Sequence, residues 1–160
     1  MTQLFEIQES PALYLIGLSA DFYGGMSPKF NGQEVLGPLW GKVHQALAAL
    51  GIERTKMIGA TRTADSGEEG LLNQFVGAVV SEVPANIGDL EVLALPAMKL
   101  ATYEHHGSMN GLVASIQKFY GEVLPGQGCA RSGDWHLEIY DERFDLSKAD
   151  SVMLIAAPIK

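Results

Sequence analysis

Apolar residues in the first half of the chain alternate between short runs typical of strands and one helical repeat. The Gly-rich segment 21–37 predicts a long loop. From Pro38 to Gly51, apolar residues recur at intervals of three and four, which predicts an amphipathic helix with proline in its first turn. The apolar stripe of this helix is Leu39, Trp40, Val43, Leu47 and Leu50. The predicted strands of this half are residues 5–8, 12–19, 54–63 and 72–83.

The second half of the chain repeats this order of elements. Apolar positions step at helical spacing from Met109 to Val123, and Pro125 and Gly126 predict the end of that helix. Runs of strand length precede and follow the helix. These predicted strands are residues 90–95, 98–106, 135–141 and 152–159.

The two halves also resemble each other residue by residue. Shifted by 85 positions, residues 5–15 overlay residues 90–100 with four identities in eleven. We therefore predict an α+β fold of two strand–helix–strand–strand units related by a pseudo-twofold axis. The units are expected to form an antiparallel sheet with both helices on one side and a groove between the repeats on the face without helices. The chain, residues 1–160, is predicted to be a single domain with repeat halves at about 1–83 and 89–160.

Charge and length narrow the classes of partner. Eleven lysines and arginines against nineteen aspartates and glutamates give a formal net charge of −8 at pH 7. Nucleic-acid binding needs clustered basic residues, so this balance argues against a direct nucleic-acid partner. It also argues against an anionic membrane surface, and no apolar run reaches the roughly 18 residues that span a bilayer. Because the first residues lack a signal-peptide pattern, we expect a cytoplasmic protein.

The segment 135–140 is the most informative for chemistry. Side chains alternate along a strand, so two sets of three face opposite ways. One set is Trp135, Leu137 and Ile139, and the other is His136, Glu138 and Tyr140. We expect the apolar set to face the core that the helix covers. If the polar set lines a groove, Glu138 is a partly desolvated carboxylate beside aromatic rings, which suits an organic cation. Alternatively it acts as a general base with a raised pKa, or it is an ordinary solvent-exposed residue.

Metal ligands and cofactor motifs are sparse in the sequence. His105 and His106 are adjacent in a predicted strand, so their side chains point to opposite faces and cannot easily bind one metal ion. One of them is expected to be a hydrogen-bonded structural residue, with Gly107 allowing the tight turn into the helix. The single cysteine, Cys129, excludes an internal disulfide and a cysteine-based zinc site. We expect neither a metal nor a cofactor.

Several apolar side chains have two interpretations. Trp40 lies on the apolar stripe of the first helix, which is typical of a core residue, although a ligand platform is the alternative. Phe75 and Met109 lie near the ends of predicted elements, and each is interpreted as a core residue or as a groove wall. Tyr103 precedes the two histidines on the same predicted strand and is a further candidate wall.

Six stretches of sequence occur in an order that resembles a known family. They are Leu-Ile-Gly-Leu-Ser (15–19), Gly-Pro-Leu-Trp (37–40), Leu-Glu-Val-Leu-x-Leu-Pro-Ala (90–97), Tyr-x-His-x-Gly (103–107), Leu-Glu-Ile-Tyr-Asp (137–141) and Ala-Pro-Ile-Lys (157–160). Together they resemble the gyrase-inhibitor-like (GyrI-like), or AraC-type effector-binding, small-molecule-binding domains. The similarity is greatest to the stand-alone members found as integron cassette proteins.

The resemblance implies a duplicated fold with a ligand groove between its halves. In multidrug-sensing members, a buried glutamate of the penultimate strand meets cationic aromatic compounds, and the matching position is Glu138, with Tyr140 two residues on. Two departures matter. Many members have an aromatic residue where this chain has Met109, which implies a differently shaped ligand. Transcriptional regulators of this family carry a preceding DNA-binding domain, which this sequence lacks, so we do not expect direct control of transcription.

The first hypothesis is a stand-alone binding module, not an enzyme, for a cationic or amphipathic small molecule such as a drug or effector. Its candidate ligand contacts are Glu138, Tyr140, Tyr103, Trp40, Phe75, Met109 and His136. The resemblance also implies a second hypothesis, a hydrolase of reactive cyclopropane-containing compounds with Glu138 and Tyr140 as catalytic residues. A third is a gyrase-inhibitor-type protein interaction. Haem binding, known for a related fold, lacks an axial-ligand signature here.

Overall fold

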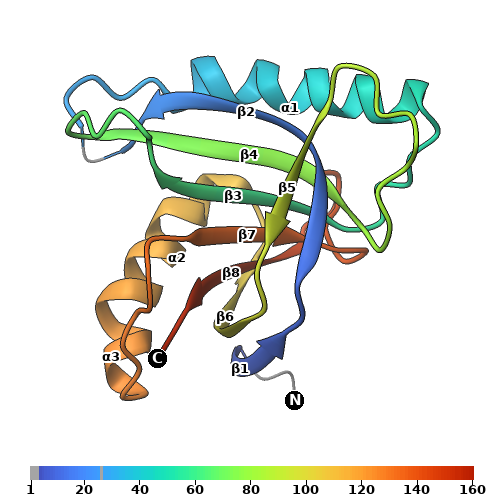
Figure 1. Cartoon of the computed structure of the whole chain (residues 1–160). Coiled ribbons are helices and arrows are strands. Elements are labelled where there is room, and N and C mark those ends of the chain that lie inside the picture. Colours follow the sequence, from blue (N-terminus) through green and yellow to red (C-terminus); the bar gives the residue numbers. More distant parts are fainter. Residues whose placement is uncertain (1–3, 26) are drawn as a thin grey trace. The chain divides into compact units, whose positions relative to one another are not determined.

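The computed structural model describes residues 4–25 and 27–160, and their contacts group the chain into two units (Figure 1). We call Leu13–Leu95 the inner unit. We call Met1–Ala12 together with Pro96–Lys160 the outer unit. The chain crosses from one unit to the other at Ala12–Leu13 and at Leu95–Pro96.

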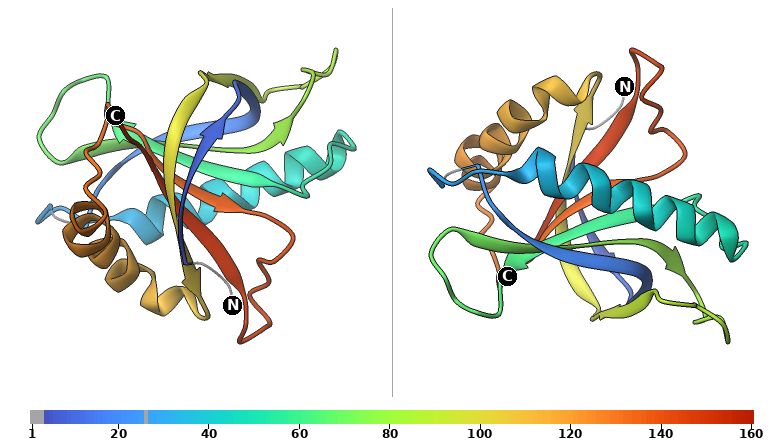
Figure 2. Two further views of the ribbon diagram at one scale, coloured as in Figure 1. Left: turned by 90° about the horizontal axis from the view of Figure 1, so that it is seen from below. Right: turned by 90° about the horizontal axis from the view of Figure 1, so that it is seen from above.

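The inner unit is an antiparallel four-stranded sheet with one long helix. Its elements are β2 (Leu13–Tyr23), α1 (Gly32–Ala49), β3 (Met57–Thr63), β4 (Leu71–Val80) and β5 (Glu91–Leu95). The strand order is β3-β4-β2-β5. Helix α1 runs along one face of this sheet and buries Leu39, Val43 and Leu47, three members of the predicted apolar stripe (Figure 2).

The outer unit is also an antiparallel four-stranded sheet, with a segmented helix. Its elements are β1 (Phe5–Ser10), β6 (Met98–His106), a 3₁₀ turn (Met109–Gly111), α2 (Leu112–Lys118), a π-helical turn (Phe119–Val123), α3 (Leu124–Gly126), β7 (His136–Tyr140) and β8 (Val152–Pro158). The strand order is β1-β6-β8-β7. The four helical segments follow one another directly, so together they match the single predicted helix.

Both units have the same topology, and the predicted α+β class is confirmed. In each unit, three strands come from a continuous strand–helix–strand–strand segment of the chain. The fourth strand is an edge strand that pairs with the first strand of that segment. The shift of 85 residues places Leu13, the start of β2, on Met98, the start of β6. The edge strands are exchanged, because β1 pairs with β6 and β5 pairs with β2. The compact units therefore have different boundaries from the repeat in the sequence.

Helix α1 begins six residues before the predicted start at Pro38, and β2 extends into the predicted loop as far as Tyr23. Pro38 lies inside the helix and has no N–H to donate to the carbonyl of Glu34. Both residues are exposed, so water can reach the carbonyl that lacks a helical partner. The rule that places proline in the first turn of a helix therefore gave the wrong start.

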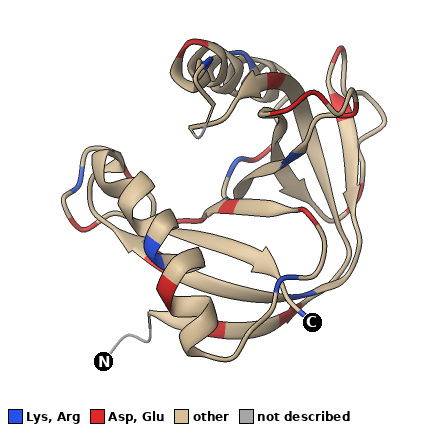
Figure 3. Ribbon diagram, turned by 90° about the vertical axis from the view of Figure 1, so that its left-hand side faces the viewer, with Lys and Arg blue, Asp and Glu red and all other residues tan. Residues whose placement is uncertain are grey.

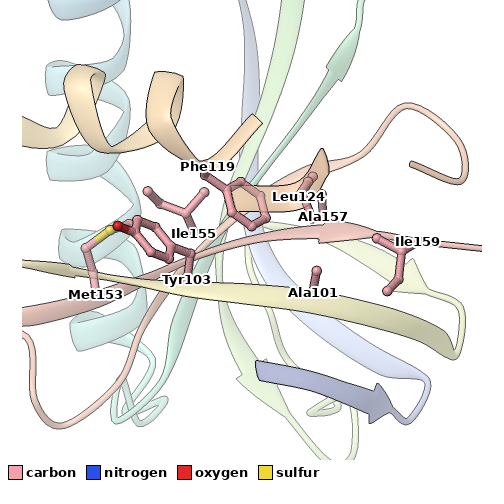
Figure 4. Packing of buried hydrophobic residues seen from close by; sticks show 8 residues of the cluster. All are labelled: Ala101, Tyr103, Phe119, Leu124, Met153, Ile155, Ala157 and Ile159. Atoms are coloured by element: carbon pink, nitrogen blue, oxygen red, sulfur yellow. The ribbon is translucent and has the colours of Figure 1, made fainter. Parts of the chain in front are cut away.

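A cluster of buried apolar residues joins the helical segments of the outer unit to its sheet (Figure 4). Phe119 is completely buried and lies among Tyr103 of β6, Ile155 of β8 and Leu124 of α3. Burying a side chain of this size contributes about 2–3 kcal/mol. The cluster defines which face of the β1-β6-β8-β7 sheet the helical segments cover.

Acidic residues are dispersed over helices, strands and loops of both units (Figure 3). No helix among the described residues is long and apolar enough to cross a membrane.

Candidate functional site

The position of Glu138 follows from the pairing of β7 with β8. Glu138 lies opposite Ile155, and Ile155 belongs to the buried cluster that contains Phe119. The face of β7 that carries His136, Glu138 and Tyr140 is therefore the face that the helical segments cover.

The prediction that Trp135, Leu137 and Ile139 face the helix is wrong. Leu137 and Ile139 are 2% and 4% exposed, but they lie on the other face of the strand, and Trp135 precedes the strand. Alternation distinguishes the two faces of a strand, and it does not say which of them a helix covers. A sheet that is buried on both faces needs apolar side chains on the face without the helix as well.

Both carboxylate oxygens of Glu138 accept hydrogen bonds from side chains of its own strand. The hydroxyl of Tyr140 donates to Oε1 over 2.9 Å, and Nε2 of His136 lies 3.0 Å from Oε2. The side chains of Glu138 and His136 are 14% and 17% exposed. Such hydrogen bonds stabilise a carboxylate that is largely removed from water.

A third side chain, Tyr120 of the π-helical turn, extends this network. Its hydroxyl lies 2.6 Å from Nδ1 of His136, and the guanidinium of Arg131 lies 4.7 Å from the centre of its ring. An ionised carboxylate only accepts, so Nε2 of His136 carries the proton that points at Glu138. In a neutral imidazole Nδ1 then accepts from the Tyr120 hydroxyl. The hydrogen bonds run from Tyr120 through His136 to Glu138, and from Tyr140 to Glu138.

The network keeps Glu138 ionised. Burial raises the pKa of Glu138, but the hydrogen bond and charge of His136 and the hydrogen bond from Tyr140 outweigh it, so the pKa lies below the ordinary 4.5. The raised pKa that a general base would need is therefore not found. Burial and the nearby Glu138 carboxylate raise the pKa of Tyr140 well above 10, and burial is the main cause that raises the pKa of Tyr120 to about 12. At neutral pH the site holds one carboxylate and two protonated phenols.

Several aromatic rings lie on the same helix-covered face as this carboxylate. Tyr103 lies opposite Ile155 on β6, so Tyr103 and Glu138 flank the same residue from the two neighbouring strands. The ring of Tyr140 packs edge-on against Phe144 at 4.7 Å between centroids. Met109 packs against the same buried cluster. The outer unit thus places five of the predicted contacts on this face or against its buried cluster, namely Glu138, Tyr140, Tyr103, His136 and Met109.

The other two predicted contacts, Trp40 and Phe75, belong to the inner unit. The ring of Trp40 on α1 packs over Gly59, and a Cβ added to Gly59 would lie 3.4 Å from a carbon of that ring. Gly59 pairs with Val76, so α1 lies on the Val76 face and Phe75 points to the opposite face of the sheet. Trp40 and Phe75 are therefore not brought together with each other.

The sequence did not single out Tyr120, Arg131 or Phe144. Tyr120 was placed only within the second helical stripe. A tyrosine beside a fully buried phenylalanine needs a hydrogen-bond partner for its hydroxyl, which is the signal that would have found the link to His136. Nothing in the sequence indicates that Arg131 and Phe144, from two different loops, pack on Tyr120 and Tyr140.

The two adjacent histidines have the predicted opposite orientations. His105 is 4% exposed, with Nδ1 2.7 Å from the Ser115 hydroxyl and Nε2 2.8 Å from the carbonyl oxygen of Ser108. Gly107 follows with a φ of +89°, which glycine adopts readily. His106 lies on the exposed side, 2.8 Å from Glu104. Across residues 4–25 and 27–160, no three His, Cys, Asp or Glu side chains form a group that could hold a metal ion.

The inner unit contains a hollow of about 680 Å³, and none of the predicted contacts lines it. It lies between the loop after β2 and the turn before β4, and its charged side chains Lys29, Glu68 and Glu69 are exposed. Without a buried charge, this hollow lacks the feature that distinguishes the surroundings of Glu138.

Comparison with known proteins gives one family and several similar structures. The family model described as "GyrI-like small molecule binding domain" matches residues 5–160. The structure of SAV2435 bound to tetraphenylphosphonium has a TM-score of 0.75 at 15% identity, covering 98% of this chain and 93% of that one. Integron cassette protein VCH_CASS2 of Vibrio cholerae has a TM-score of 0.67 at 14% identity, covering 99% and 97%.

The C-terminal domain of EcmrR has a TM-score of 0.66 at 18% identity, covering 98% of this chain and 96% of that one. At these identities the similar structures establish the fold. A comparison with curated protein sequences finds no match.

Proposed function

The chain belongs to the family of GyrI-like small-molecule-binding domains, and on this premise we propose that it binds an organic cation with an aromatic or apolar body at Glu138. The observation that carries the proposal is a single one. Glu138 is a carboxylate that is 14% exposed, held ionised by two hydrogen bonds, and placed on a sheet face lined with aromatic rings.

The charge of Glu138 is the proposed source of affinity. When His136 is neutral, both hydrogen bonds to the carboxylate come from uncharged donors and leave its negative charge uncompensated. A charge with little access to water interacts with an opposite charge more strongly than an exposed one does. A ligand cation at this position would supply the missing positive partner.

The rings around Glu138 are the proposed source of selectivity for an apolar body. Tyr140, Tyr103 and Phe144 present aromatic surface on or beside the helix-covered face. A cation over such a ring gains about 0.5–2 kcal/mol, with the larger value where water is excluded. Met109 adds a flexible, polarisable side chain to the same cluster. The bound tetraphenylphosphonium of SAV2435, a protein of the same fold, is a cation of this chemical class and supports the proposal.

The acidity of Glu138 favours binding over hydrolysis. A general base is most effective when its pKa lies near the working pH. The pKa of Glu138 lies below 4.5, because the hydrogen bonds and charge outweigh burial, so the carboxylate is a weak base at neutral pH. It is suited to hold a cation instead.

The test is a calorimetric titration with tetraphenylphosphonium at about pH 8, where an ordinary histidine is neutral. Glu138→Gln keeps the shape of the side chain and removes its charge, and we expect the affinity to fall by on the order of 100-fold. Glu122→Gln is the matched control, because it removes the same charge from an exposed position in the outer unit. Equal affinities of the wild type and Glu138→Gln would contradict the proposal, as would an equal loss in both variants.

A further inference from the structure

We infer that His136 determines when the site accepts a cation. When His136 is an imidazolium, it forms an ion pair with the Glu138 carboxylate. When it is a neutral imidazole, the negative charge of Glu138 is available to pair with the ligand cation. This inference rests on the proposed role of Glu138 as the anchor of the ligand. It adds that cation binding is coupled to release of one proton from His136.

The geometry makes His136 a direct competitor of the ligand. Its Nε2 lies 3.0 Å from Oε2 of Glu138, and both side chains are more than four-fifths buried. At this distance an imidazolium forms an ion pair with the carboxylate. A ligand cation at the same carboxylate then meets a like charge that little water screens. The neutral ring removes this repulsion and still donates its Nε2 hydrogen to Glu138.

Tyr120 allows His136 to exist in both states without rearrangement. Its hydroxyl lies 2.6 Å from Nδ1 of His136. A hydroxyl both donates and accepts, so it donates to Nδ1 of the neutral ring and accepts from Nδ1–H of the charged ring. The change between states turns one O–H bond and leaves the heavy atoms in place. The site is therefore built to release the proton when a cation arrives.

The groups around His136 have fixed charges over the relevant range of pH. Glu138 faces it on its own strand, and Tyr120 faces it from the π-helical turn, with Arg131 over the tyrosine ring. From β8, the side chains on this face are apolar, namely Met153, Ile155 and Ala157. The exposed Asp134 lies two residues earlier in the preceding loop. Carboxylates, tyrosine and arginine keep their charge states between about pH 5.5 and 8, whereas histidine ordinarily titrates there.

The consequence is a pH-dependent affinity for a permanent cation. Tetraphenylphosphonium has no titrating group, so any dependence belongs to the protein. We expect its affinity to rise about tenfold between about pH 5.5 and pH 8, within the range typical of coupled sites. Because one proton is exchanged, the rise cannot exceed about tenfold per pH unit.

The experiment is calorimetry of the wild type, His136→Gln and Glu138→Gln at both pH values, in two buffers with different ionisation enthalpies. The wild type should bind more weakly at about pH 5.5 and release up to about one proton per ligand there, and almost none at about pH 8. The glutamine of His136→Gln supplies an uncharged N–H donor, so this variant should bind equally at both pH values. Glu138→Gln should lose affinity at both.

The other possible results contradict either the role of His136 or the proposed function. Wild-type binding that needs Glu138 but neither changes with pH nor releases protons refutes the role of His136 and leaves the proposed function intact. A pH dependence that persists in His136→Gln refutes it also. No binding by the wild type at about pH 8 refutes the proposed function, and this inference with it.

One further measurement uses only the wild type, so it tests the inference even if His136→Gln does not fold. Imidazole nitrogen NMR of the wild type at about pH 5.5 should show His136 changing, as tetraphenylphosphonium is added, from the doubly protonated ring to the neutral ring with its proton on Nε2. A ring that stays doubly protonated in the complex would refute the coupling.

Discussion

Replacing Tyr140 by phenylalanine removes the hydroxyl that donates to Glu138 and keeps the aromatic ring. The ring that packs edge-on against Phe144 at 4.7 Å is retained. What is lost is the O–H that donates to Oε1 of Glu138 over 2.9 Å, and the carboxylate that loses it is 14% exposed. The substitution therefore tests whether hydrogen bonding offsets the burial of this charge.

The expected cost follows from the type of bond. A hydrogen bond to a charged group contributes about 1.5–3 kcal/mol, and an ionised oxygen left without its donor is at the upper end of that range. For a chain of 160 residues this corresponds to a decrease of about 3–12 °C in Tm. The effect is large for a single atom because little water is available to replace the donor.

The cost should also depend on pH. Burial raises the pKa of Glu138, but the bonds from His136 and Tyr140 bring the folded value below the ordinary 4.5. Such a group stabilises the fold above its unfolded pKa, and this contribution is lost as the pH falls through the folded value. The difference in stability between Tyr140→Phe and the wild type should therefore be largest near neutral pH and should shrink under acidic conditions.

The assay is urea unfolding followed by circular dichroism, near neutral pH and near pH 3, where about nine-tenths of ordinary carboxyls are protonated. The control is Tyr23→Phe, which removes the same kind of bond, from a tyrosine hydroxyl to Glu68 over 2.5 Å, at an exposed position. We expect no measurable change in the control, because water replaces the donor. If both variants lose the same stability, or if the Tyr140→Phe loss does not change with pH, the reasoning about burial is refuted.

Two predictions concern the framework that positions the site, both measured by the free energy of unfolding. Phe119→Ala should destabilise the protein by about 3–5 kcal/mol because this ring is completely buried. The control Val113→Ala, at a residue that is 65% exposed, should change stability little. Equal losses of stability in the two variants would refute the assignment of Phe119 to the core. Gly17→Ala should prevent stable folding, since a Cβ would overlap the carbonyl oxygen of Val76, while Gly41→Ala, in open space on α1, should stabilise by about 0.5–1 kcal/mol. A folded Gly17→Ala of wild-type stability would contradict the close approach of β2 and β4.

The sequence predicted most elements and one decisive feature of the site. Alternation along β7 correctly grouped His136, Glu138 and Tyr140 on one face, because the period of two is a property of the strand itself. The shift of 85 residues correctly aligned the starts of β2 and β6. These are local or repeated patterns, which a sequence records directly.

The remainder depends on contacts between segments that are distant in the chain. Which face of β7 the helix covers follows from the packing of Phe119 near Ile155, and no spacing within residues 135–140 encodes it. The lowered pKa of Glu138 depends on which side chains reach it, so burial alone suggested the wrong direction. The early start of α1 depends on the solvent exposure of Pro38, which a single sequence does not reveal.

The most direct test of the central claim is a crystal structure of this protein with tetraphenylphosphonium. The proposal predicts the phosphonium beside the Glu138 carboxylate, with its phenyl groups against the rings of Tyr140 and Tyr103. A cation bound instead in the hollow beside Lys29 and Glu68, with Glu138 untouched, would contradict it.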